Sequence, residues 1–492
     1  MQLVRNNPVS DAIDSIRTAA APESELPIIL VGTGPVAIRF AEELYKRGYR
    51  GDLVIFGEEP WDPYHRIKLT SLLAGDIEVD EIESNIVDIA NHKIVQHLSR
   101  RIIAIDYARK TVTDSNNQVH HYHKLVLATG SRARVPDIPG TKKSGIFTFR
   151  NLEDTEALLE RKKSACNIAV VGGGLLGLEA AWALRKSGAN IVIVHQASRL
   201  LNRQLDEQGA ALLQKKMEDL GIRVYLGSGL AAILGDSTVK GIKLRNDQRL
   251  ICDTVLLATG IRPNSELARQ SWISVAAGIK VDNQMRTSAR DVYAIGDCIE
   301  HNDKIYGLLL PGYEQAAVLA KQLLDYNSQY LGSVRYSKPK VIDEAVFSVG
   351  EVVNIPNSSF FKEIDWLAKE TGQYRKLVTK RGRLIGAMAV GECTEAWRIL
   401  EAVQQHRRLR FWHLWRFRKT GRLWPKTEST VNNVKRWPAD AFVCQCMGIS
   451  KGRLCDAVEK DDVTSVDELS SVTQAGSVCG GCKLLLAELI AS

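Results

Sequence analysis

The sequence has no long hydrophobic run, and its N-terminus lacks the hydrophobic segment of a secretion signal. A helix that crosses a bilayer needs roughly 20 consecutive apolar residues, and no stretch of this chain approaches that length. Residues 1–25 are polar and include acidic side chains, which argues against a secretory leader. These absences predict a cytoplasmic protein without a membrane span.

Cysteine is missing from the first 165 residues, and four of the nine thiols lie singly along the chain. So few and so scattered cysteines exclude a disulfide-stabilised scaffold in a chain of this length. We interpret Cys166 and Cys252, which flank predicted strands, as small core residues. Cys298 is interpreted in the same way, as a packing residue.

Acidic residues are scarce over residues 407–436, where ten Lys and Arg residues accompany one acid, Glu428. Tryptophan is concentrated in and around the same stretch, at Trp397, Trp412, Trp415, Trp424 and Trp437. Packing of an amphipathic helix on the body explains this pattern best, and docking of a partner enzyme is the main alternative. Alternating aromatic and basic residues are also typical of single-strand nucleic-acid platforms, but the rest of the sequence predicts no nucleic-acid partner.

Residues 27–58 have the pattern of a nucleotide-binding unit. Residues 27–31 read as a buried parallel strand, followed by a glycine-rich turn, a helix over 37–47 and a second strand over 53–56. Such a strand–turn–helix–strand unit binds a dinucleotide pyrophosphate at the helix N-terminus.

Each special position of this turn has a physical role. Gly32 permits the tight turn, Gly34 lets the backbone approach a pyrophosphate, and Ala37 lets the helix pack on the strand. Pro35 opens the helix. An acid after the second strand accepts hydrogen bonds from a ribose diol, and Glu58 is the candidate, with Glu59 beside it.

The unit is repeated further along the chain. A strand over 167–171 leads into a loop that carries Gly172, Gly174 and Gly177, then into a helix over 178–186 and a strand over 190–194. Two dinucleotide sites in one chain predict one for FAD and one for NAD(P)H.

Three further strands end in small residues. The first ends at Thr129-Gly130, the second at Gly260, and the third at Gly296-Asp297. The first two mark places where the chain crosses between domains. The carboxylate of Asp297 can accept a hydrogen bond from a sugar-alcohol hydroxyl.

The order of these motifs resembles that of the two-dinucleotide-binding flavoprotein reductases. The resemblance implies that the first glycine loop and the Gly-Asp pair hold FAD and that the second loop holds the nicotinamide nucleotide. It places a basic residue, Arg66, near the flavin, and Glu179 near the nicotinamide; a first-turn carboxylate that offsets the helix dipole is the alternative role for Glu179. The implied cofactor-binding set is Gly32, Gly34, Pro35, Glu58, Arg66, Thr129, Gly130, Gly172, Gly174, Gly177, Glu179, Gly260, Gly296 and Asp297. No catalytic acid or base is needed for the hydride transfer.

The choice between NADH and NADPH depends on the end of the second strand in the repeated unit. That strand ends Val194-His195-Gln196, without the acid that favours NAD, and Arg199 and Arg203 could meet a 2′-phosphate. The resemblance favours NADH, because related NADH-dependent reductases also carry His at this position.

Four cysteines form two pairs near the C-terminus, Cys444 with Cys446 and Cys479 with Cys482, separated by 32 residues. Four thiolates on two loops suit either a zinc ion or an iron–sulfur cluster. The C-x-C, two-helix, C-x-x-C arrangement resembles the bacterioferritin-associated ferredoxin-like (BFD-like) module, which binds a 2Fe-2S cluster. Cys455 lies outside both pairs and is left out of the ligand set.

The complete order of modules resembles the nitrite reductase large-subunit family, and most of all its relatives that are electron-transfer subunits of assimilatory nitrate reductase. Many flavoprotein relatives keep a dithiol beside the flavin, and here the spacing offers none. The sequence ends ten residues after Cys482, before any sirohaem-binding motif, so we expect it not to reduce nitrite alone. The implied acceptor is a molybdenum nitrate reductase catalytic subunit. The alternatives are a nitrite reductase, an oxygenase, or a redox-sensing or scaffold role without turnover.

We therefore predict an α/β fold with two Rossmann-like domains of the pyridine nucleotide-disulfide oxidoreductase type, a small α+β interface domain and a C-terminal helical 2Fe-2S domain. We also expect the cluster domain to move on its basic connector. The predicted divisions are a tail over 1–25, an FAD domain over 26–145 and 261–330, an NAD(P)H domain over 146–260, an interface domain over 331–400, a basic Trp-rich linker over 401–440 and the 2Fe-2S domain over 441–492.

Overall fold

The structure is a computed structural model. It describes residues 26–83, 93–338, 340–341, 344–425, 434–439, 441–460, 463–478 and 480–491. The predicted tail over 1–25 and the predicted ligand Cys479 therefore lie outside the described residues.

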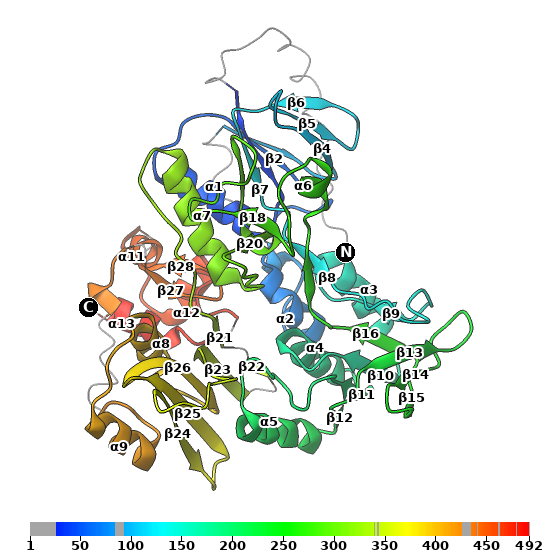
Figure 1. Cartoon of the computed structure of the whole chain (residues 1–492), viewed down its shortest axis with the longest axis vertical. Coiled ribbons are helices and arrows are strands. Elements are labelled where there is room, and N and C mark those ends of the chain that lie inside the picture. The colour runs from blue at the N-terminus through cyan, green and yellow to red at the C-terminus, as the bar shows by residue number, and fades with distance from the viewer. Residues whose placement is uncertain are drawn as a thin grey trace.

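The first domain is built on a five-stranded parallel sheet with the order β19-β7-β1-β2-β3. The predicted strand appears as β1, in register with β2 on one side and β7 on the other. Helices α1 and α7 pack against each other in this domain (Figure 1). Its main elements are β1 (Ile28–Val31), α1 (Pro35–Lys46), β2 (Leu53–Phe56), β3 (Ile94–His97), β7 (Lys124–Leu127), β19 (Val292–Ala294) and α7 (Leu309–Leu323).

Smaller elements complete this domain. A three-stranded antiparallel sheet extends from it, and one short antiparallel strand pair, Ser131–Ala133 with Ile261–Pro263, lies at the crossovers to the second domain. These elements are η3 (Arg66–Lys68), α2 (Leu69–Ala74), η4 (Asp80–Ile82), β4 (Ile102–Asp106), β5 (Thr111–Asp114), β6 (Val119–His121), β8 (Ser131–Ala133), β17 (Ile261–Pro263), α6 (Glu266–Gln270), β18 (Ile279–Val281), η6 (Gly296–Cys298) and β20 (Ile299–His301).

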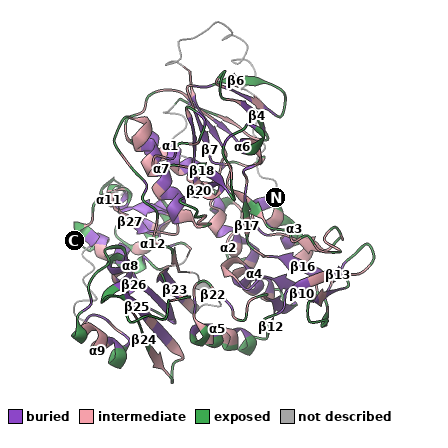
Figure 2. Ribbon diagram, in the orientation of Figure 1, coloured by how far each residue is buried: buried purple, intermediate pink, exposed green. Residues whose placement is uncertain are grey.

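The second domain repeats the plan with a parallel sheet of order β12-β11-β10-β16-β9. Its three central strands, β11, β10 and β16, are almost entirely buried (Figure 2). Helices pack on one face of this sheet, and the antiparallel sheet of β13, β14 and β15 packs on the other. The elements are β9 (Ile146–Phe147), α3 (Leu152–Lys162), β10 (Asn167–Val171), α4 (Leu175–Arg185), β11 (Asn190–Val194), α5 (Glu207–Asp219), β12 (Arg223–Tyr225), β13 (Leu230–Leu234), β14 (Gly241–Leu244), β15 (Arg249–Ile251) and β16 (Thr254–Leu257).

The third domain is an antiparallel sheet with the main order β21-β23-β26-β25-β24, covered by two helices. Its elements are β21 (Tyr336–Ser337), β22 (Lys340–Val341), β23 (Glu344–Gly350), β24 (Phe361–Ala368), β25 (Gln373–Lys380), β26 (Arg383–Val390), α8 (Ala396–Gln404) and α9 (Phe411–Thr420).

The structure places residues 401–425, predicted as the first part of a basic linker, in packed elements instead. Phe417, Leu423 and Trp424 are buried in the core of the third domain. The physical reason is that apolar side chains alternate with the basic ones, so one side of the segment packs while Trp412 and Trp415 stay exposed. This is the amphipathic packing that the sequence favoured.

The C-terminal domain consists of a two-stranded ribbon and three helices around one small core. The two helices expected between the cysteine pairs are present as α11 and α12. Its elements are η7 (Val434–Arg436), β27 (Phe442–Cys444), β28 (Ile449–Ser450), α11 (Lys451–Lys460), α12 (Val466–Thr473) and α13 (Lys483–Ile490). The predicted fold class is therefore confirmed.

The C-terminal domain is docked on the first domain (Figure 1). Arg39 on α1 donates to the backbone oxygen of Gly448 at 3.3 Å, and Glu42 on the same helix pairs with Arg453 at 3.8 Å. The ring of Tyr313 lies so close to Gly448 that a Cβ there would be 2.2 Å from it. This arrangement brings the loop that follows Cys446 against the first domain, while the expectation that the C-terminal domain moves stays a prediction.

No helix among the residues that the structure describes is long and apolar enough to cross a membrane.

Candidate functional site

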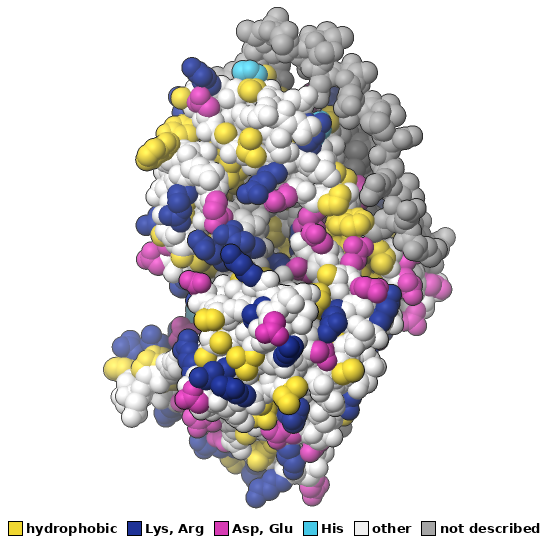
Figure 3. Space-filling view, turned by 90° about the vertical axis from the view of Figure 1, so that its right-hand side faces the viewer, with side chains coloured by type: hydrophobic (Ala, Val, Ile, Leu, Met, Phe, Trp, Pro, Cys, Tyr) yellow, Lys and Arg dark blue, Asp and Glu magenta, His cyan; other side chains and the backbone are white. Residues whose placement is uncertain are grey.

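A cavity of about 940 Å³ lies between the first and second domains. Five arginines contribute to the cavity wall. On the face of the molecule seen in Figure 3, several Lys and Arg side chains gather midway along its length. Ten of the predicted cofactor-binding residues line the cavity: Gly32, Gly34, Pro35, Glu58, Arg66, Thr129, Gly130, Glu179, Gly296 and Asp297. The sequence therefore anticipated much of this wall, but not its contacts.

The first glycine loop has the geometry that its sequence requires. Gly32 has φ +123°, and a Cβ there would lie 2.3 Å from the backbone oxygen of Ala128 on the neighbouring strand. Gly34 is the N-cap of α1, and its nearest neighbour beyond the loop is the Arg66 side chain, 3.9 Å from a Cβ position. The loop thus leaves room beside the helix N-terminus for an anionic pyrophosphate.

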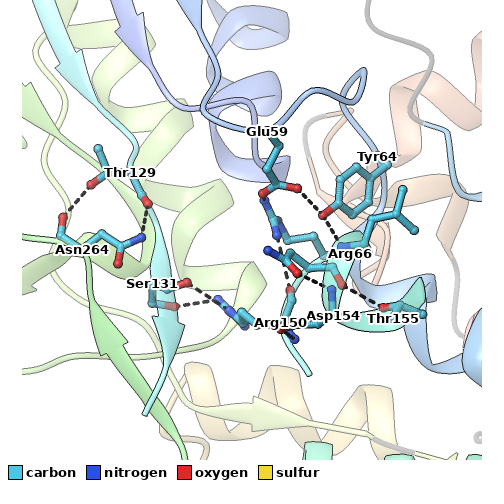
Figure 4. Close-up of polar contacts among 11 residues, drawn as sticks. Glu59, Tyr64, Arg66, Thr129, Ser131, Arg150, Asp154, Thr155 and Asn264 are labelled. Carbon is cyan, nitrogen blue, oxygen red and sulfur yellow. Dashed lines mark hydrogen bonds and ion pairs between the residues drawn. The ribbon is translucent and has the colours of Figure 1, made fainter. Parts of the chain in front are cut away.

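The two candidate acids after β2 have different surroundings, and Figure 4 shows those of Glu59. Glu59 is held by an ion pair with Arg66 and accepts a hydrogen bond from the Tyr64 hydroxyl at 2.7 Å. The Glu58 side chain is 67% exposed and lies 3.4 Å from Arg101. Since Glu59 already forms an ion pair with Arg66, Glu58 is the better placed of the two carboxylates to accept hydrogen bonds from a ribose.

Arg150 is the residue that the sequence reasoning missed. Its guanidinium donates to Asp297 Oδ2 at 2.6 Å and to Ser131 Oγ at 2.7 Å, while Ser131 Oγ also donates to Asp297 Oδ2 at 3.0 Å. All three side chains line the cavity. The only sequence signal was a single arginine between β9 and the N-cap of α3, which nothing in the pattern linked to Asp297 some 147 positions away.

The crossovers between the domains are fixed by a reciprocal contact. Thr129 Oγ1 donates to the backbone oxygen of Asn264 at 2.7 Å, and the Asn264 amide returns a hydrogen bond to the backbone oxygen of Thr129 at 2.8 Å (Figure 4). This pair holds the strand end at Thr129 and gives the cavity a rigid edge.

The glycines of the second loop have different structural roles. A Cβ at Gly172 would lie 2.1 Å from the Ala258 oxygen, and one at Gly177 would lie 2.0 Å from the Gly172 oxygen. Gly174 has nothing within 4 Å of its Cβ position. Close packing therefore requires Gly172 and Gly177, whereas Gly174 leaves open space where a ligand can approach.

The second loop adjoins the cavity but is not part of its wall. Leu176 and Glu179 of α4 line the cavity, while Gly172, Gly174, Gly177 and Gly260 do not. A nucleotide on the second loop would thus reach the cavity from the α4 side.

Two cysteines of the C-terminal domain lie together, with 3.6 Å between the sulfur atoms of Cys444 and Cys446. Two thiolates on one tetrahedral metal with bonds of about 2.3 Å stand roughly 3.8 Å apart, so this spacing fits shared ligation. The Cys446 and Cys482 thiols, with the backbone N–H groups of Gly476 and Met447, hold the pKa of Cys444 well below its usual range.

These surroundings favour the thiolate form, which metal ligation needs. Among the described residues no three His, Cys, Asp or Glu side chains form a complete metal-binding group. The fourth predicted ligand, Cys479, falls outside them. The donor set present, with thiolates on two glycine-bearing loops, fits an iron–sulfur cluster.

Among the described residues, no cysteine lines the cavity. Cys298 is fully buried and burial raises the pKa of its thiol to about 11, which agrees with a packing role. Cys252 is buried as predicted, but the prediction for Cys166 was wrong, because it precedes β10 at an exposed turn.

Models of known families cover most of the chain. Residues 26–322 match the pyridine nucleotide-disulphide oxidoreductase family. The chain belongs to this family. Residues 337–407 match the rubredoxin NAD+ reductase C-terminal domain, and residues 442–492 match the BFD-like [2Fe-2S] binding domain. The predicted cofactors FAD, NAD(P)H and a 2Fe-2S cluster are thereby confirmed.

Two curated relatives come from Bacillus subtilis (strain 168). The chain is 34% identical over 467 residues to nitrite reductase [NAD(P)H] and 32% identical over 466 residues to the assimilatory nitrate reductase electron transfer subunit. Each match covers 94% of this chain but only 57% and 59% of the respective relative. The chain thus spans little more than half the length of these proteins.

The fold also occurs in solved structures. The NAD-dependent persulfide reductase from A. fulgidus aligns with a TM-score of 0.72 and 25% identity, over 78% of this chain and 77% of that one. Putidaredoxin reductase in its covalent complex with putidaredoxin aligns with a TM-score of 0.71 and 22% identity, over 77% and 93%.

Proposed function

We propose that this chain takes electrons from NAD(P)H onto FAD, passes them singly to the 2Fe-2S cluster, and delivers them to a molybdenum nitrate reductase catalytic subunit. The observation that carries the proposal is the docking of the cluster domain on the wall of the flavin cavity. The cofactors supply the hydride and electron chemistry, and the protein supplies their position and environment.

Two residues support this route, because each lies between the cavity and the C-terminal domain. Ile67 lines the large cavity and also packs against the core of the C-terminal domain, which contains Cys444 and Cys482. Pro35 lines the large cavity and also a small cavity of about 40 Å³ at the junction with the C-terminal domain. A flavin in the large cavity would thus be separated from the cysteine domain by single side chains.

An anaerobic NADH titration tests the relay. Because the flavin is the hydride acceptor and the cluster its electron acceptor, flavin absorbance should bleach and a low-temperature EPR signal of spin one-half should follow. Iron and sulfide analysis of the same sample is the control. Bleaching without a paramagnetic cluster, in protein that contains no iron or sulfide, would contradict the relay and support a zinc or thiol site.

The choice of acceptor rests on the similarity to the nitrate reductase electron transfer subunit. The similarity to nitrite reductase keeps that enzyme as a second candidate. Prereduced protein mixed with each candidate separates the two, because only the true acceptor reoxidises the cluster at a rate that rises with its concentration. Absence of steady NADH-dependent reduction of any acceptor would favour a redox-sensing role.

We expect NADH to be preferred over NADPH by at least about tenfold in kcat/KM, a difference of about 1.4 kcal/mol. Burial lowers the pKa of His195, so its imidazole carries no charge for a 2′-phosphate. The Arg199 guanidinium is turned to the backbone oxygens of Leu205 and Asn202, at 3.1 and 3.4 Å.

Steady-state rates with both nucleotides, for the wild type and for Arg203→Ala, check this preference. Of the two arginines considered, Arg203 is exposed and remains the candidate to contact a 2′-phosphate. An NADPH preference that Arg203→Ala abolishes would contradict the expectation.

A further inference from the structure

A lysine from the third domain lies across the C-terminal cysteine loop. Lys338 directly follows β21, the edge strand of its sheet. Gly481, between Cys479 and Cys482, faces it so closely that a Cβ there would lie 2.8 Å from Lys338 Nζ and 3.2 Å from its Cδ. Gly481 does not have a positive φ, and all the atoms that its Cβ would meet belong to the lysine side chain, so the Lys338 ammonium lies directly beside this loop.

Among the residues that the structure describes, no carboxylate forms an ion pair with Lys338. Its positive charge also reaches the buried thiol of Cys393, where it opposes the rise in pKa that burial causes. Lys338 is thus a cation held between two domains and directed at the ligand loop.

The cation at the other cysteine loop has a different environment. The Arg39 guanidinium donates a hydrogen bond to the backbone oxygen of Gly448. The same guanidinium forms ion pairs with Glu43 at 2.5 Å and with Glu42 at 3.4 Å. These carboxylates offset its charge. Of Arg39 and Lys338, only Lys338 has no carboxylate partner among the residues that the structure describes.

We propose that the Lys338 ammonium raises the reduction potential of the 2Fe-2S cluster and so makes it a better electron acceptor for the flavin. This inference rests on the cluster of the proposed function. One-electron reduction adds a negative charge to a centre that four thiolates already make anionic. A nearby positive charge stabilises the reduced form more than the oxidised form, and net charge and hydrogen bonds to sulfur are known determinants of cluster potential.

A charge series at this position tests the proposal: Lys338→Arg, Lys338→Met and Lys338→Glu. The cluster is poised with dithionite and mediators, without NADH, and its reduced fraction is read by EPR. Lys338→Met should lower the ratio of reduced to oxidised cluster at fixed ambient potential about tenfold, which is 59 mV for one electron. Lys338→Glu should lower it about a hundredfold, and Lys338→Arg should leave it unchanged.

Controls separate a charge effect from a structural one. Lys215→Met, at an exposed position of α5 in the second domain, removes the same charge and should leave the cluster potential unaltered. The flavin potential and the shape of the cluster EPR signal should also stay constant through the series.

Equal potentials for the wild type and Lys338→Met would overturn the proposal. So would an Arg variant that behaves like the Met variant, because loss of packing and not of charge would then explain the shift. A wild-type protein with no iron and no EPR signal would instead refute the proposed function, so the two failures are distinguishable.

Discussion

Cys444→Ser should abolish the cluster signal in EPR while NADH still bleaches the flavin at close to the wild-type rate. Cys444 lies 3.6 Å from Cys446, sulfur to sulfur, in surroundings that lower the pKa of its thiol. Losing one of four thiolates removes the cluster. NADH-dependent reduction of the protein acceptor should then fall at least about 100-fold, a loss of about 2.7 kcal/mol or more in transition-state terms. Parallel stopped-flow absorbance and EPR measure the two halves of the reaction.

Cys455→Ser is the matched control, because Cys455 belongs to the same small core but lies on α11, outside both cysteine pairs. It should keep the cluster and full electron transfer. Since metal binding contributes to the folding of small metal domains, circular dichroism of both variants should accompany the kinetics. A spin one-half signal that survives in Cys444→Ser would refute the ligand assignment.

Substitution of Gly32 and of Gly172 by alanine should impair the binding of two different cofactors. Both glycines have φ well above zero, and at both a Cβ would lie within 2.3 Å of a backbone oxygen. Strained backbone of this kind costs about 1–3 kcal/mol per residue, and the steric clash adds to it. Gly32→Ala should yield protein without FAD. Gly172→Ala should keep FAD but raise the apparent Kd for NADH at least about tenfold.

The two variants serve as controls for each other. Dithionite should reduce the flavin of Gly172→Ala normally, because its first domain is unchanged, whereas NADH should not. Bound flavin is measured by absorbance after gel filtration, and the NADH constant by the rate of bleaching. Normal FAD content in Gly32→Ala, or loss of FAD in Gly172→Ala, would show that the two loops were assigned to the wrong cofactors.

The periodic and glycine-marked parts of the molecule were predictable from sequence. The strands at Ile28–Val31 and Asn167–Val171 are where their continuous apolar runs and the glycines after them placed them. The helices that follow begin at Pro35 and Leu175, two to three residues earlier than predicted. Local rules suffice there, because the tight turn and the buried strand are dictated by neighbouring residues.

What the sequence could not predict were contacts between distant segments. Arg150 meets Asp297, and Lys338 lies over Gly481, although each pair is separated by more than a hundred positions. The basic segment at 401–425 looked like a connector because charge dominates its composition. Only the position of Phe417 and Trp424 in the core of the third domain shows that it is part of a folded unit.

The flavin cavity is bounded by α4, with Leu176 and Glu179, on the side of the second domain, and by Pro35 and Ile67 on the side of the cysteine domain. In the proposed function, reducing equivalents would therefore enter this chamber at the wall formed by α4 and leave it at the wall formed by Pro35 and Ile67. Release of the oxidised nucleotide and electron transfer to the cluster would then not compete for the same surface.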